Sequence, residues 1–160
     1  MQMFLLNIVL AVVYLILSGS LSPSNLVVGF VIGFVIVSIY AQVAGQASYA
    51  VKGLRFAGFV WYFIRILIKA NLQVAWEVIT PGFQMRPRII RYPVEDLTLV
   101  QMTTLANAIT LTPGTLSADI DEQARCLYIH CMYAEDRAAV ISDLDELKRE
   151  MLRGIFGSDT

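Results

Sequence analysis

The first third of the sequence lacks ionisable side chains. Residues 1–51 contain no Lys, Arg, Asp, Glu or His. This absence excludes an ordinary soluble fold for the segment, because some face must meet water and roughly a quarter of the residues in soluble domains are charged. The segment consists of two apolar runs, residues 1–17 and 23–43, joined by a short Ser/Gly-rich linker. At about 1.5 Å per helical residue, the second run reaches the thickness of a bilayer hydrocarbon core, about 30 Å.

The two runs predict a transmembrane helical hairpin, whose first helix is slightly short for a full span. A cleaved signal peptide is the alternative for the first run, but that run has no basic start and a second span follows it at once. Asn7 lies within the first run, and either a partner helix or the headgroup layer would solvate its amide. Gly29 and Gly33 share one face of the second run. They predict a helix-packing seam, against either the first run or another chain.

Charge returns unevenly after residue 51. Residues 52–91 carry a net charge of +6, whereas residues 92–160 carry a net charge of −7. A basic segment directly after a membrane span lies on the cytoplasmic side under the positive-inside rule. We therefore expect both termini and the whole second half of the chain to be cytoplasmic, and the linker at residues 18–22 to face outward.

Cysteine and histidine are scarce, with two Cys and one His in the chain. Cys126 and Cys131 lie too far apart in one predicted strand to form a disulfide, so free buried thiols are expected. His130 precedes Cys131, and adjacent strand residues point to opposite faces, which excludes a Cys–His nucleophile pair. The spacing of a metal site and a Gly-rich phosphate loop are both absent. The sequence therefore predicts no catalytic, cofactor-binding or metal residues, and a protein that is not an enzyme.

A loop is expected over residues 42–53, followed by a helix over residues 56–79 that admits two interpretations. Polar residues recur there every four positions and form one stripe along the helix: Arg65, Lys69, Gln73 and Glu77. An interfacial or partner-docked helix would let Arg65 and Lys69 contact the membrane surface or a partner. A third membrane span would place both cations in hydrocarbon, which is costly unless the helix packs inside a larger complex. Glu77 is either a proton relay or a helix-end carboxylate.

Beyond a break at Pro81–Gly82, residues 84–160 predict a small cytoplasmic α+β domain with the order β-α-β-β-α. Its sheet is expected to be mixed or antiparallel and covered on one side. Strands are expected over residues 86–93, 115–121 and 126–134, and helices over residues 95–110 and from residue 135 onward. Arg86, Arg88 and Arg91 are expected to contact anionic lipid or an acidic partner rather than nucleic acid. The predicted divisions of the chain are therefore residues 1–51, 52–83 and 84–160.

Two stretches carry a resemblance to a known family. Residues 7–33 read N-I-V-L-A-V-V-Y-L-I-L-S-G-S-L-S-P-S-N-L-V-V-G-F-V-I-G, and residues 111–121 read L-T-P-G-T-L-S-A-D-I-D, followed by L-Y-I-H at 127–130. The chain resembles the E subunit of Mrp-type (Mnh or Pha) multisubunit cation/proton antiporters over essentially its whole length. In that resemblance Thr112, Pro113 and Gly114 form a family-signature turn before an edge strand.

The resemblance implies a multi-pass chain in a prokaryotic inner membrane, within a complex that exchanges cytoplasmic sodium or potassium for external protons. The implied partners are the other antiporter subunits, both the large ion-translocating ones and the small membrane ones, together with the lipid bilayer. Ion translocation is credited to the large subunits. This chain is therefore expected to support assembly, stability or activity, without a cofactor. The alternative function is a standalone membrane-anchored cytosolic module that binds a ligand or regulates lipid traffic.

Overall fold

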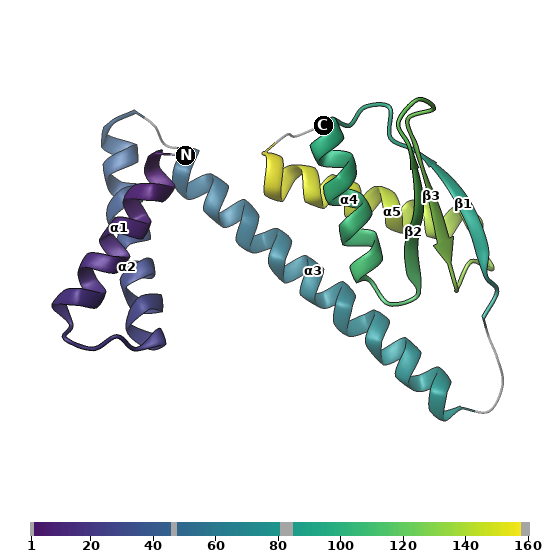
Figure 1. Cartoon of the computed structure of the whole chain (residues 1–160), viewed down its shortest axis with the longest axis horizontal. Helices are drawn as coiled ribbons and strands as arrows, with labels where there is room; N and C mark the ends of the chain where they lie inside the picture. Colours follow the sequence, from purple (N-terminus) through teal and green to yellow (C-terminus); the bar gives the residue numbers. More distant parts are fainter. Residues whose placement is uncertain (1, 46–47, 81–84, 158–160) are drawn as a thin grey trace. The chain divides into compact units, whose positions relative to one another are not determined.

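The computed structural model of the chain describes residues 2–45, 48–80 and 85–157. The chain divides into two compact units, residues 1–56 and residues 57–160. Figure 1 shows the helices of the first unit and the helices and strands of the second. The break expected at Pro81–Gly82 lies outside the described residues.

Two apolar helices form most of the first unit. α1 covers Gln2–Leu17 and α2 covers Pro23–Val43. The Ser22 side chain accepts a hydrogen bond from the Ser24 amide at the start of α2, and Pro23 has no amide hydrogen to lose at the first helical position. Among the described residues, α2 is the one helix that is long and apolar enough to cross a membrane, whereas α1 has 16 residues.

The third helix, α3, covers Ser48–Ile79 and begins earlier than the sequence predicts. The expected loop over residues 42–53 is therefore wrong from residue 48 onward. The reason is tertiary, because Tyr49 and Gly53 pack against Phe34 of α2. The ring centroids of Tyr49 and Phe34 lie 5.4 Å apart. A Cβ atom at Gly53 would lie 2.6 Å from Phe34 Cε2, so only glycine lets α3 approach the ring this closely.

The second unit contains a sheet of three antiparallel strands in the order β1-β3-β2 (Figure 1). β1 covers Arg88–Pro93, β2 covers Thr115–Asp121 and β3 covers Cys126–Cys131. The predicted combination of helices with a small sheet is confirmed, and the sheet is antiparallel rather than mixed. Two strands are shorter than predicted, since β1 begins at residue 88 and β3 ends at residue 131. Arg86 forms only an isolated bridge with Tyr133.

Residues 85–157 of the second unit, here called the sheet domain, contain two α-helices, and a side-chain cap marks the start of the first. α4 covers Leu99–Leu111 and α5 covers Arg137–Met151, followed by a π-helical turn at Leu152–Phe156. α4 begins later than the sequence predicts, because Thr98 and Gln101 form a capping box in which each side chain bonds the other residue's backbone amide.

The core of this unit lies on one face of the sheet, beneath α4 and α5. Alternate residues of β1 and β3 point into it: Ile90, Tyr92, Leu127, Ile129 and Cys131. The opposite face carries Ile89 and Leu116, which both pair with His130 and are well exposed. Both cysteines are buried free thiols, and burial raises the pKa of Cys131.

A hydrogen bond ties β1 to α5 at the edge of this core. The Tyr92 hydroxyl donates to Asp145 Oδ1 at 2.6 Å. Burial, and then this bond to the carboxylate, raises the pKa of Tyr92 above its ordinary value. The neutral phenol is therefore the form that the fold stabilises at every physiological pH.

Replacing Tyr92 with Phe should destabilise the second unit. Loss of the buried donor should lower the free energy of unfolding by about 1–2 kcal/mol, because a hydrogen bond to a charged acceptor is stronger than the average. Denaturant unfolding of the full chain in detergent would measure this change. The matched control is Tyr128→Phe on the open face of the sheet, which should change stability by less than about 0.5 kcal/mol. Equal effects of the two variants would contradict the prediction.

Candidate functional site

A buried amide lies at the centre of the first unit. Asn7 of α1 is fully buried, and its Nδ2 donates a hydrogen bond to the Tyr49 hydroxyl of α3 at 3.0 Å. Within the described part of the chain, Asn7 Oδ1 has no hydrogen-bond partner. It lies against Gly33 of α2, where a Cβ atom would be 2.3 Å away. The oxygen therefore contacts the Cα hydrogens of Gly33, a weak contact that recurs between closely packed helices.

Both glycines of the predicted packing seam face α1. A Cβ atom at Gly29 would lie 2.9 Å from the backbone oxygen of Ala11, which cannot move aside as a flexible side chain can. The buried positions of α2 recur every four residues, as a seam requires: Gly29, Gly33, Val37 and Ala41. The close approach is thus made within the chain, along one face of α2.

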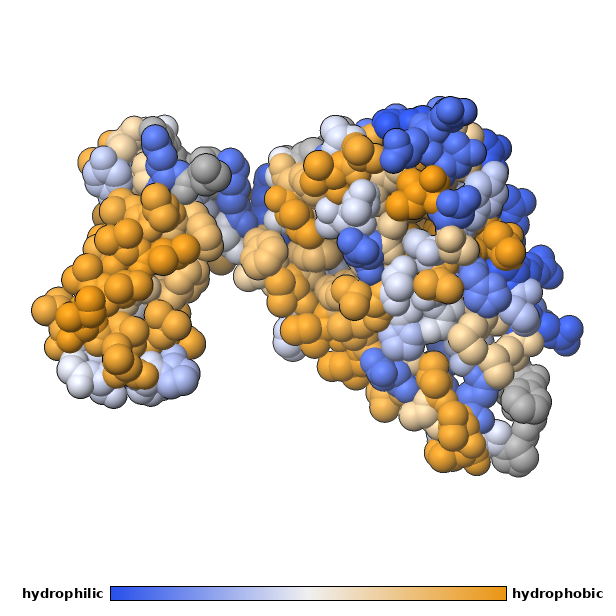
Figure 2. Space-filling view, viewed as in Figure 1, coloured by the Kyte–Doolittle hydropathy of each residue, from blue (hydrophilic) through white to orange (hydrophobic). Residues whose placement is uncertain are grey.

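The remaining surface of α1 and α2 is apolar and exposed. Figure 2 shows hydrophobic side chains over the visible face of this helix pair, with hydrophilic ones near its ends. Side chains such as Val27, Val31 and Ile39 are more than half exposed. Soluble monomers rarely leave contiguous apolar surface of this kind uncovered, so the surface of the helix pair is suited to a non-aqueous surrounding.

The part of α3 that belongs to the second unit is apolar on two faces. Its inner face packs against the core of the sheet domain through Phe59, Tyr62, Phe63 and Ile66. Its other apolar face, here called the outer stripe, consists of Trp61, Ile64, Ile68, Leu72 and Trp76, and the last three also line the pocket described next. Trp61 and Trp76 are 66% and 67% exposed, although tryptophan is usually well buried in soluble domains.

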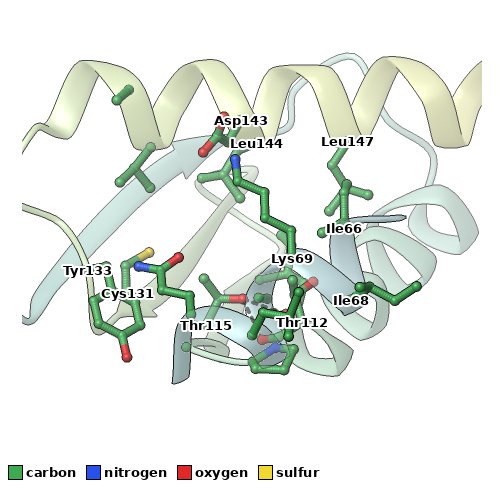
Figure 3. Close-up of a pocket in the computed structure, with 18 of the residues that line it drawn as sticks. Ile66, Ile68, Lys69, Thr112, Thr115, Cys131, Tyr133, Asp143, Leu144 and Leu147 are labelled. Atoms are coloured by element: carbon green, nitrogen blue, oxygen red, sulfur yellow. Dashed lines mark hydrogen bonds between the residues drawn. The ribbon is translucent and has the colours of Figure 1, made fainter. Parts of the chain in front are cut away.

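Between these two faces the polar stripe of α3 turns toward the sheet domain. Arg65, Lys69, Gln73 and Glu77 line a pocket of about 1270 Å³, here called the α3–α5 pocket. Residues of α5 and of the turn before β2 line its other side. Figure 3 shows Ile66, Leu144 and Leu147 on the apolar part of this pocket, and Lys69 extending across it toward Asp143.

One end of the α3–α5 pocket is closed by a contact between Glu77 and Tyr133. The Tyr133 hydroxyl donates a hydrogen bond to the Glu77 carboxylate, and this bond is the main cause of the raised pKa of Tyr133. The Tyr133 ring packs over Gly114, where a Cβ atom would lie 3.0 Å from Tyr133 Cε2. Gly114 also has a φ of +89°, a conformation that favours glycine.

Hydrogen bonds organise the turn at Thr112, Pro113 and Gly114, which connects α4 to β2. The Thr112 hydroxyl donates to the Ala108 carbonyl at 2.9 Å, so it satisfies a carbonyl at the end of α4. The Gly114 carbonyl accepts a hydrogen bond from the Met132 amide at 2.8 Å. β2, which follows the turn, is an edge strand of the sheet. The turn therefore positions the surface on which Tyr133 rests.

The predicted basic contact residues do not form one patch. Arg65, Lys69 and Arg86 line the α3–α5 pocket, whereas Arg88 and Arg91 belong to β1. Arg91 Nε donates a hydrogen bond to Cys126 Sγ at 3.3 Å. Across the described ranges, no three His, Cys, Asp or Glu residues lie together as a metal site would require.

Two features of these sites escaped the sequence analysis. Tyr49, the partner of Asn7, fell in a segment predicted to be a loop. Asp143 and Glu146 of α5 face the polar stripe of α3 across the pocket, but their i, i+3 spacing is that of any solvated helix face. The only signal in the sequence was the polar stripe, which indicates that one face of α3 is polar.

Comparison with known proteins identifies the family. Residues 7–154 match the family model of the Na+/H+ ion antiporter subunit. The E subunit of the Na(+)/H(+) antiporter of Bacillus subtilis is 33% identical over 142 residues, which cover 89% of this chain and 90% of the relative. The corresponding E1 subunit of Staphylococcus haemolyticus is 30% identical over 92% of this chain and 95% of the relative.

Solved structures give the same relationship. A chain of the Mrp complex from Dietzia sp. is 28% identical, with a TM-score of 0.50 over 64% of this chain and 97% of that chain. A chain of the membrane-bound sulfane sulfur reductase, an archaeal respiratory membrane complex, is 32% identical, with a TM-score of 0.51 over 85% of this chain and 86% of that chain. The predicted resemblance is thereby confirmed, and the chain belongs to the Na+/H+ ion antiporter subunit family.

Proposed function

We propose that this chain is a non-catalytic small subunit of a multisubunit sodium (or potassium)/proton antiporter, which it supports in assembly, stability or activity. The main support for this proposal is the match of residues 7–154 to the antiporter subunit family. Its partners are the other subunits of the complex. The family is one of transporter components rather than of enzymes, and it places the chain in a membrane.

The composition of α1 and α2 supports a role outside ion translocation. Their sequences contain no Asp, Glu, Lys, Arg or His. Ion and proton pathways through membranes are normally lined by such ionisable groups. The two helices offer instead a glycine seam and an apolar surface, which are the features of a membrane anchor.

In this proposal α1 and α2 form a membrane-spanning hairpin, with both termini and the sheet domain in the cytoplasm. The net charge of +6 over residues 52–91, which are separated from the end of α2 by the eight residues 44–51, supports this orientation. α3 then lies along the cytoplasmic headgroup layer, with its outer stripe toward lipid. Exposed tryptophans are typical of that layer, because the indole ring is amphipathic.

The seam should be required for assembly. In Gly29→Leu the new side chain meets the Ala11 backbone, and overpacking of this kind costs about 1–3 kcal/mol. We expect at least a fivefold loss of the antiporter subunits that co-purify with this chain in a mild detergent. Gly58→Leu is the matched control, since no described heavy atom lies within 4 Å of a Cβ at Gly58.

The same co-purification separates this function from the alternative of a standalone membrane-anchored binding module. A wild-type chain that emerges alone, as a monomer or homodimer, would favour the standalone module. Equal recovery of partners with the Gly29→Leu and Gly58→Leu variants would refute the role of the seam while leaving the family assignment intact.

The proposed orientation can be read from cysteine labelling. Both native thiols are buried, so introduced cysteines report alone. On intact cells a membrane-impermeant maleimide should label Ser20→Cys, between α1 and α2, but not Ala124→Cys, in the turn before β3. After the membrane is opened, both should react. Labelling of Ala124→Cys from outside would reverse the orientation, and labelling of neither or both would exclude a two-span hairpin.

Depth-dependent fluorescence quenching distinguishes an interfacial α3 from a third span. The chain has only two tryptophans, and both lie on the outer stripe, so Trp61→Phe/Trp76→Phe is free of tryptophan. Adding Ile64→Trp places one indole on the part of the stripe that lies outside the α3–α5 pocket. In vesicles with brominated lipids, bromines near the headgroup should quench it more than bromines near the chain end. Stronger quenching by the deep bromines would indicate a span.

A further inference from the structure

The α3–α5 pocket has the size and lining of a site for an amphiphilic ligand. Its volume of about 1270 Å³ exceeds that of most small-molecule sites, which hold about 300–1,000 Å³. Apolar side chains from both helices form one part of it, including Ile66, Leu144 and Leu147 (Figure 3). Charged side chains surround that apolar part. A ligand that fills this pocket therefore needs both a hydrocarbon portion and a charged portion.

Charges of opposite sign face each other in the middle of the pocket, while Glu77, Arg86, Glu135 and Asp136 also line it. Arg65 and Lys69 project from α3, and Asp143 and Glu146 project from α5. None of these four, so far as the described residues show, takes part in an ion pair. Opposite charges that face each other without forming an ion pair leave their hydrogen-bonding groups available to a ligand. A ligand with one anionic and one cationic group would meet a partner on each side.

Packing at both ends keeps α3 and α5 from closing on each other. At one end Tyr62 and Ile66 of α3 pack against the core of the sheet domain. At the other end Glu77 accepts the hydrogen bond from Tyr133, whose ring rests on Gly114. Arg65 and Lys69 of α3 lie between these two contacts along the helix. The pocket is a built feature of the packing.

We propose that the α3–α5 pocket binds a phospholipid with a primary ammonium headgroup, of the phosphatidylethanolamine class. Its phosphate lies between Arg65 and Lys69, since guanidinium and ammonium groups are the usual phosphate partners. Its ammonium group donates to Asp143 and Glu146, and part of an acyl chain covers Ile66 and the leucines of α5. This inference rests on the proposed position of α3 at the headgroup layer, which brings the pocket to a supply of lipid.

The carboxylates favour a primary ammonium over a choline group. A primary ammonium has three N–H donors for the oxygens of Asp143 and Glu146. A trimethylammonium has none and is normally recognised by an aromatic cage. An anionic headgroup without an ammonium would leave the α5 carboxylates facing a negative charge.

The test uses the delipidated full chain in detergent, with lipid binding followed by native mass spectrometry. Phosphatidylethanolamine should bind to one saturable site at least tenfold more tightly than phosphatidylcholine or phosphatidylglycerol. Lys69→Gln and Asp143→Asn should each weaken that binding about tenfold, which is the effect of losing one charge-assisted hydrogen bond. Lys52→Gln and Glu122→Gln, which change charges outside the pocket, should leave it unchanged.

Three results would overturn the inference. Equal binding of the three lipids would refute recognition of the ammonium group. Equal affinity for soluble glycerophosphoethanolamine would show that the ligand is a free phosphate ester rather than a lipid. Loss of binding in the control variants as well would place the lipid elsewhere on the chain. Co-purification of antiporter subunits does not depend on these lipids. If the chain co-purifies with its partners but shows no lipid preference, this inference is refuted and the proposed function stands.

Discussion

A pair of helices without ionisable side chains can be surrounded only by hydrocarbon or by another apolar surface, and the rest of the molecule depends on this constraint. Hydrogen bonds within each helix satisfy the backbone groups, which the interior of a bilayer demands. What remains is the contact between the helices. Gly29 and Gly33 supply it by letting α1 approach the backbone of α2, and Asn7 is buried inside the contact with Tyr49 as its partner.

α3 packs through apolar contacts in both units of the chain. Its first turns pack on Phe34 in the first unit, and its later turns pack on the core of the sheet domain through Phe59 and its neighbours. One helix, Ser48–Ile79, thus contributes residues to both units. The polar stripe of α3 lines the α3–α5 pocket, and the outer stripe adds an exposed apolar face. That face is the natural contact surface for a membrane or a neighbouring protein.

The comparisons join this architecture to large membrane complexes. Similar chains occur in an Mrp complex and in an archaeal respiratory membrane complex. The absence of ionisable groups from α1 and α2 agrees with a component that supports ion translocation from beside the pathway.

The sequence alone determined the features that depend on neighbours along the chain. The charge-free run predicted apolar helices, alternation predicted the strands, and the L-T-P-G-T stretch pointed to the family. Tertiary structure decided the rest, because the deciding contacts join residues far apart in sequence. Phe34 extends α3 back to Ser48, Tyr49 gives Asn7 its partner, and Glu77 meets Tyr133 at the end of the pocket. The sequence shows that α3 has a polar stripe, but only the fold shows that Asp143 and Glu146 of α5 face this stripe across the pocket.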